Sequence, residues 1–156
     1  VVGTWLTQQH RRQKEAIVDH HQVLRVSIED SVAVMTMCDT TYQNTMTFEM
    51  TKAIRSSIPR IKRDAKVIIL TSSLTHFHVG LNPAKVREWS DRPTCHVAAD
   101  MKECYMGFVE LATLGIPLIA VLNGKVYGGG LPIALWCDYR IATSDVDMHF
   151  GNISRG

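Results

Sequence analysis

The chain carries glycines in two loops, and at the triplet of the second loop a backbone N–H group could bind an anion or a carbonyl oxygen. Gly128, Gly129 and Gly130 stand together before an apolar run, and Gly80 lies in an earlier loop. A glycine has no side chain to keep a ligand from the backbone, and the N–H groups of a first helical turn have no partner within the helix. The plainer alternative is that the triplet only permits a sharp turn or close packing, and a lone triplet favours that alternative.

The glycines do not form a nucleotide-binding loop. No Gly-Lys-Ser/Thr follows the triplet, and the Gly-x-Gly-x-x-Gly spacing of dinucleotide-binding loops is absent from the sequence. Pro132 stands two residues after the triplet, and a helix tolerates proline in its first turn, where a missing N–H costs no hydrogen bond. The triplet is therefore predicted to open a helix that runs to Trp136.

Both glycine loops follow short apolar runs of the kind that form strands buried on both faces. These runs are residues 66–73 (KVIILTSS) and 116–124 (IPLIAVLNG), and residues 137–145 (CDYRIATSD) form a third. Strands that alternate with helices in this way predict an α/β fold with a parallel sheet. Because ligands of such sheets bind at the carboxyl ends of the strands, we expect the two loops to converge on one site.

The chain before these loops is predicted to begin the same sheet. Residues 23–39 alternate apolar and polar side chains around Asp30 and Ser31, as a hairpin does. An amphipathic helix should follow, with Thr47 as its N-cap. Pro59 is expected to end or bend that helix near Ser57, because proline cannot donate the helical hydrogen bond.

Further helices are predicted at residues 84–90 and 97–114, the second ended by Gly115. Residues 1–22 are polar and are interpreted as a linker or an exposed segment, whereas residues 23–156 are interpreted as the N-terminal part of one domain. The chain begins at Val1 and stops soon after a predicted strand. We therefore interpret it as a fragment whose domain is incomplete at the C-terminus.

Composition excludes several classes of partner. The 156 residues are 46% hydrophobic, which is enough for a substantial core. The sequence has 17 Lys and Arg and 15 Asp and Glu, which gives a net charge of +2. So balanced a charge argues against nucleic acid or a membrane surface as the main partner. The four cysteines lack Cys-x-x-Cys spacing, so no metal site or disulfide framework is expected. We therefore expect a cytoplasmic or other reducing intracellular compartment.

Three segments resemble one known family. Residues 116–142 (IPLIAVLNGKVYGGGLPIALWCDYRIA) resemble the signature of the crotonase superfamily, the enoyl-CoA hydratases and isomerases. Residues 66–82 (KVIILTSSLTHFHVGLN) are similar to the block that precedes this signature, and residues 43–47 (QNTMT) resemble the family's Asn-Ala-Leu/Met segment. The resemblance implies repeated ββα units around a parallel sheet, assembled as homotrimers or hexamers, and it extends from about Val23 to the end of the chain.

The resemblance also implies a site. In this family two backbone N–H groups hold the carbonyl oxygen of an acyl thioester, and the matching positions are Leu81 and Gly129. The substrate would be carried by coenzyme A or by the phosphopantetheine of an acyl carrier protein, with no other cofactor. The residues predicted to contact the substrate are Gly80, Asn82, Gly128, Gly130 and Tyr127.

Two catalytic glutamates of the family's hydratases are missing. Pro132 occupies the first glutamate position, and the second falls at Asn152, or at Ser154 if the alignment is shifted. Adding water to a double bond needs a base and an acid, and proline supplies neither. The resemblance therefore favours a decarboxylase or isomerase, and QNTMT resembles the decarboxylases of polyketide β-branching.

The residue roles and the activity leave alternatives open. A decarboxylase needs a cation near the leaving carboxylate, and His78 and Lys85 are candidates, with Asn152 as a residue that could orient water or a carbonyl. Structural roles for His78 are the competing interpretation. The protein could instead be a degenerate domain that only binds or assembles, or a hydratase whose acids lie beyond Gly156. A nucleotide-binding α/β domain is disfavoured because the phosphate motifs are absent.

Overall fold

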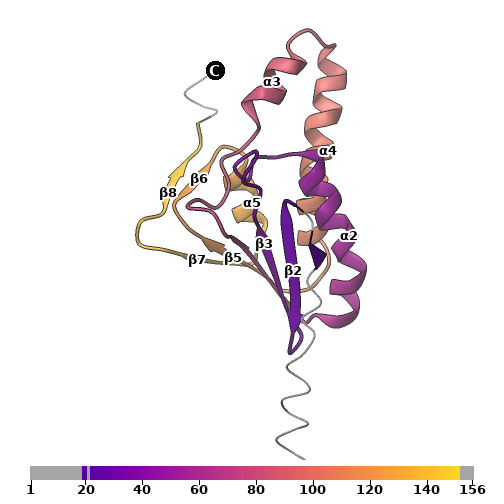
Figure 1. The fold of residues 1–156 in the computed structure, drawn as a ribbon, viewed down its shortest axis with the longest axis vertical. Helices are drawn as coiled ribbons and strands as arrows, with labels where there is room; N and C mark the ends of the chain where they lie inside the picture. The colour runs from indigo at the N-terminus through magenta and orange to yellow at the C-terminus, as the bar shows by residue number, and fades with distance from the viewer. Residues whose placement is uncertain (1–18, 21, 152–156) are drawn as a thin grey trace, which may run out of the picture.

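A six-stranded sheet is the centre of the fold (Figure 1). The computed structural model describes residues 19–20 and 22–151. The sheet has the order β1-β2-β3-β4-β5-β7; β1 and β2 pair antiparallel, as do β2 and β3, and every later pair is parallel. The strands are β1 Asp19–His20, β2 Leu24–Glu29, β3 Val32–Met37, β4 Val67–Ser72, β5 Leu118–Leu122 and β7 Tyr139–Ala142. The α/β class and the parallel sheet are confirmed.

The predicted hairpin is formed by β2 and β3. Asp30 and Ser31 both have positive φ, 48° and 65°, as the central residues of a type I′ turn do. On β3 the side chains of Ala33, Met35 and Met37 are fully buried, which matches the alternation of the sequence. The prediction for residues 1–22 lies almost wholly outside the described residues, although β1 pairs with β2 at Asp19 and His20.

Helix α2, Phe48–Asp64, begins as predicted and ends later than predicted. The Thr47 side chain accepts a hydrogen bond from the Met50 N–H at 3.2 Å. The helix continues through Pro59 for five more residues, so of the two predicted outcomes, an end or a bend near Ser57, the end is wrong. Pro59 lies on the exposed side, where water can hydrate the carbonyl that loses its partner, and the fully buried Ile61 holds the last turn against the core.

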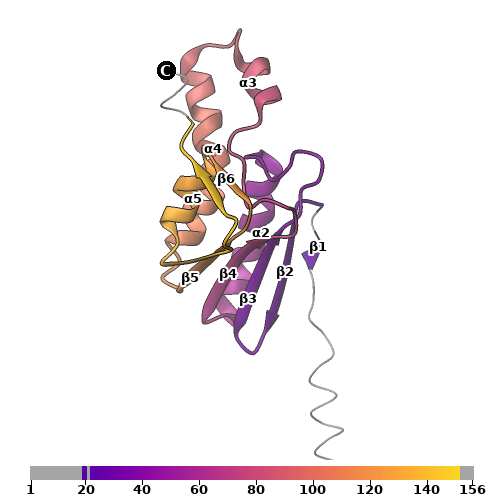
Figure 2. The same cartoon turned by 90° about the vertical axis from the view of Figure 1, so that its left-hand side faces the viewer.

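Helices α2 and α4, Thr94–Ala112, pack side by side against the sheet (Figures 1 and 2). A Cβ on Gly107 would lie 2.9 Å from the Thr51 Cα, so glycine allows the two backbones to approach this closely. The Thr51 hydroxyl donates to the Cys104 carbonyl at 2.6 Å, and Arg55 on α2 forms an ion pair with Glu110 on α4 at 2.7 Å. These contacts fix α4 relative to the sheet.

Two shorter helices and a second small sheet complete the described chain. Helix α3 is Pro83–Trp89, and α5 is Gly130–Trp136, which confirms the helix predicted after the glycines. The small sheet pairs β6, Lys125–Tyr127, with β8, Asp147–His149, in parallel. Neither strand was predicted, because three residues are too few for an alternation to be recognised. β6 carries the chain from β5 to the glycine triplet.

Strand β7 differs from its prediction. The sequence indicated a strand buried on both faces, yet all four of its residues are exposed, and Tyr139 and Ile141 keep 66% and 60% of their accessible surface. As the last strand of the sheet, β7 has a neighbouring strand, β5, on one side only among residues 19–20 and 22–151. All four cysteines are free thiols, and no helix in the described part of the chain is both long and apolar enough to cross a membrane.

Candidate functional site

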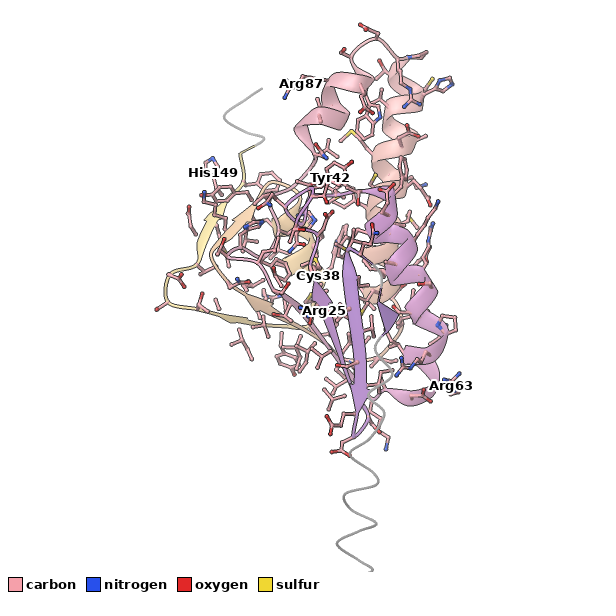
Figure 3. All side chains as sticks on the ribbon, viewed as in Figure 1. Arg25, Cys38, Tyr42, Arg63, Arg87 and His149 are labelled. Carbon is pink, nitrogen blue, oxygen red and sulfur yellow. The ribbon has the colours of Figure 1, made fainter. Side chains whose placement is uncertain are left out.

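The two glycine loops converge on one cavity, as expected from the sheet topology. The cavity has a volume of about 510 Å³ and lies between the loop after β4, the glycine triplet, helices α3 and α4, and strand β8. Figure 3 labels two residues on its border, Arg87 on α3 and His149 on β8. The lining residues are Val79, Gly80, Leu81, Val86, Arg87, Met101, Tyr105, Tyr127, Gly128, Gly129, His149 and Gly151.

Backbone hydrogen bonds hold the two glycine loops together. The Tyr127 N–H donates to the His78 carbonyl at 2.9 Å, and the Gly128 N–H donates to the His149 carbonyl at 2.9 Å. The loop after β3 also contributes, since the Met46 N–H donates to the Gly80 carbonyl at 2.8 Å. These bonds place the backbone of residues 78–81 directly beside that of residues 127–129.

The side chain of Asn44 locks the loop after β3 to the loop after β4. Asn44 is completely buried; its amide donates to the Ser72 hydroxyl at 2.8 Å and to the Phe77 carbonyl at 3.3 Å, and its carbonyl oxygen accepts from the Asp39 N–H at 2.9 Å. The QNTMT segment noted in the sequence is therefore part of the scaffold that positions the cavity. No structural role for this asparagine was predicted from the sequence.

Gly80 brings the Leu81 and Gly129 N–H groups close to each other. A Cβ on Gly80 would lie 3.1 Å from the Gly129 nitrogen, and the φ of Gly80 is +90°, which side chains rarely allow. Only one carbonyl carbon separates the Gly80 Cα from the Leu81 nitrogen. Within the described residues neither the Leu81 N–H nor the Gly129 N–H has a hydrogen-bond acceptor, and both residues line the cavity. The arrangement offers two donors to a single ligand atom.

The three consecutive glycines have three different surroundings. Gly128 has a φ of +49°. A Cβ on Gly129 would lie 2.6 Å from the Tyr105 hydroxyl oxygen, and a Cβ on Gly130 would lie 2.5 Å from the His78 carbonyl oxygen. Gly128 and Gly129 therefore line the cavity, whereas Gly130, predicted as a substrate contact, allows α5 to pack against the loop after β4.

His78 has surroundings that do not suit the cation predicted for a decarboxylase. Its side chain is fully buried, and burial lowers its pKa to about 3, so the imidazole is neutral. The Nδ1 atom accepts from the Gly80 N–H at 3.0 Å, which places the proton on Nε2, and the ring meets Phe108 edge-on with centroids 5.9 Å apart. His78 does not line the cavity; it holds Gly80 in position.

Two other predicted site residues, Asn82 and Tyr127, make contacts that the sequence did not indicate. Asn82 caps α3, its side-chain oxygen accepting from the Ala84 N–H at 2.9 Å, and does not line the cavity. Tyr127 lines the cavity, but its hydroxyl donates to Asp147, which raises the pKa of the phenol. Asn152 lies outside the described residues, and Pro132 lies in the first turn of α5, as predicted.

The structure adds polar groups that the sequence did not single out. Tyr105 on α4, Arg87 on α3 and His149 on β8 all line the cavity. Each is isolated in the sequence from the glycine loops, and no spacing rule relates a residue of α4 to a turn that follows a different strand. The packing of α3 and α4 brings Arg87 and Tyr105 to the site, and the pairing of β8 with β6 brings His149 there.

The fold and the site together define an α/β protein with a ligand cavity at the carboxyl ends of its parallel strands. The enoyl-CoA hydratase/isomerase family model matches residues 27–152, so this chain belongs to that family. This confirms the resemblance seen in the three sequence segments.

Two curated relatives illustrate the match. A Mycobacterium tuberculosis protein (strain H37Rv) named "Probable enoyl-CoA hydratase EchA14" is 29% identical over 119 residues, which are 75% of this chain and 45% of the relative. The fatty acid oxidation complex subunit alpha of Pseudomonas syringae pv. tomato is 31% identical over 108 residues, 66% of this chain and 15% of the relative. The chain thus spans less than half the length of either.

Solved structures share the fold. The enoyl-CoA hydratase from Polaromonas sp. JS666 superposes with a TM-score of 0.78 and 18% identity, covering 85% of this chain and 52% of that chain. The enoyl-CoA hydratase from Bacillus halodurans gives a TM-score of 0.73 and 22% identity, covering 81% and 52%. At such identities the likeness demonstrates the crotonase-like fold alone.

Proposed function

We propose that this chain is part of an enzyme that binds an acyl thioester and holds its carbonyl oxygen with the N–H groups of Leu81 and Gly129. The observation that carries the proposal is the pair of unpaired N–H groups in one cavity. When the thioester becomes an enolate, negative charge develops on this oxygen, and donors already in place stabilise it. One such donor typically lowers a barrier by about 2.7–4 kcal/mol.

Within the family we propose a decarboxylase or isomerase in place of a simple hydratase. Loss of CO₂ generates an enolate without a base, so this chemistry does not require the glutamate that Pro132 replaces. Arg87 supports this choice because its guanidinium gives the cavity border a positive charge that suits a substrate carboxylate. Coenzyme A and an acyl carrier protein remain the proposed carriers, and assembly into trimers or hexamers remains a prediction.

A second candidate function rests on the same proline. A domain without the catalytic acids could bind acyl thioesters, or assemble with a partner, and do no chemistry.

The experiment that separates these functions incubates the full-length protein with methylmalonyl-CoA and with crotonyl-CoA. CO₂ release from the first supports decarboxylation, hydration of the second supports acids outside the described residues, and binding without turnover supports the non-enzymatic domain.

A further inference from the structure

The hydroxyl of Tyr105 lies close to Gly129. A Cβ placed on Gly129 would come within 2.6 Å of the Tyr105 hydroxyl oxygen, and both residues line the cavity. A ligand oxygen that accepts the Gly129 N–H would therefore have this hydroxyl close by, and so would the carbon next to the thioester carbonyl. The phenol comes from α4, whereas the two N–H groups come from the glycine loops.

The Tyr105 hydroxyl is protonated and available. Across residues 19–20 and 22–151 it has no hydrogen-bond partner, unlike the Tyr127 hydroxyl, which donates to Asp147. Partial burial raises the pKa of the Tyr105 phenol above its ordinary value, so it carries its proton at neutral pH. Its ring meets Trp136 edge-on with centroids 5.8 Å apart, which fixes the direction of the hydroxyl.

We propose that Tyr105 is the catalytic residue that protonates the enolate at its α-carbon, an inference that rests on the proposed function. The Tyr105 O–H bond breaks and a C–H bond forms at the α-carbon, using the electron pair of the enolate carbon–carbon double bond. The thioester carbonyl re-forms and a tyrosinate remains, which solvent water reprotonates after product release. The reaction is balanced without an oxidant or reductant.

Other groups of the site are less suited to this step. Pro132 has no proton to give, and His78 is buried away from the cavity lining. Under the proposed function the Leu81 and Gly129 N–H groups hold the oxygen, which leaves the hydroxyl for the carbon. His149 also lines the cavity and is the competing donor, because histidine side chains serve as general acids in enzymes.

The configuration of the product tests the proposal. The full-length protein and its Tyr105→Phe variant are given methylmalonyl-CoA or crotonyl-CoA in D₂O, because either reaction places one deuterium on the α-carbon. Phenylalanine keeps the ring and its contact with Trp136. Tyr139→Phe, at an exposed tyrosine on β7, is the matched control. His149→Gln tests the competing donor, and thermal unfolding verifies that each variant is folded.

We expect the wild-type protein and the control to give one configuration at the deuterated carbon and Tyr105→Phe to give an equal mixture. A single configuration in the product of Tyr105→Phe overturns the proposal. A mixture of configurations from His149→Gln, with a single configuration from Tyr105→Phe, does so as well. If the wild-type protein turns over neither thioester, the proposed function fails and Tyr105 as proton donor fails with it. An active wild-type protein with a stereospecific Tyr105→Phe variant leaves the proposed function standing and removes only the Tyr105 step.

Discussion

Replacing Gly129 by proline removes one proposed donor with little change in the backbone. The φ of Gly129 is −61°, close to the value of about −65° that the proline ring imposes. The Gly129 N–H has no acceptor within the described chain, so no internal hydrogen bond is lost. Proline does add a Cβ, which would lie 2.6 Å from the Tyr105 hydroxyl and 2.8 Å from the Met46 Cε.

Gly129→Ala is the matched control, because alanine brings the same Cβ and keeps the N–H. Such overpacking costs about 1–3 kcal/mol of stability in either variant. The loss of the donor affects only the proline variant, and it should lower kcat by a further factor of about 10²–10³, corresponding to 2.7–4 kcal/mol.

The assay measures kcat for whichever thioester the wild-type protein turns over, together with thermal unfolding of the three proteins. Equal kcat values for folded Gly129→Pro and Gly129→Ala would refute the assignment of the Gly129 N–H as a donor to the reacting oxygen. A difference in the melting temperature alone would indicate that the position matters for packing only.

Three further predictions concern the scaffold. Gly80→Ala places a residue with a side chain at a φ of +90° and brings a Cβ within 3.1 Å of the Gly129 nitrogen. Urea unfolding should show that the free energy of unfolding decreases by about 1–3 kcal/mol, and turnover should be reduced. Thr47→Ala removes the N-cap of α2 and should cost about 1 kcal/mol by the same measurement, whereas Thr47→Ser should retain most of it. In the folded protein His78 has a pKa of about 3 and is neutral, whereas in the unfolded chain it takes up a proton near its ordinary pKa. The free energy of unfolding should therefore decrease as the pH is lowered from about 6.5 to about 3. The slope due to this residue is at most about 1.4 kcal/mol per pH unit, and it should be absent from His78→Asn; an identical pH dependence in that variant would contradict the burial argument.

Local features of the sequence determined the order and type of most elements. The alternation of residues 23–39 gave the hairpin, and Thr47 gave the start of α2. The glycine triplet with Pro132 gave the start of α5. Each of these depends on neighbours within a few residues, where backbone sterics and hydrogen bonding to adjacent groups decide the outcome. The same glycines, with the segments on either side, were enough to indicate the family.

The environment of each side chain was decided only by the tertiary structure. His78 and Tyr105 both have an aromatic ring with a polar group. Nothing nearby in the sequence indicates that the His78 side chain is buried in contact with Phe108 or that Tyr105 lines the cavity. The exposure of β7 and the passage of α2 through Pro59 are likewise set by where each element lies in the sheet and its layers. Burial, pKa and access to a ligand depend on atoms that are distant in sequence and adjacent in space, so a local pattern cannot fix them.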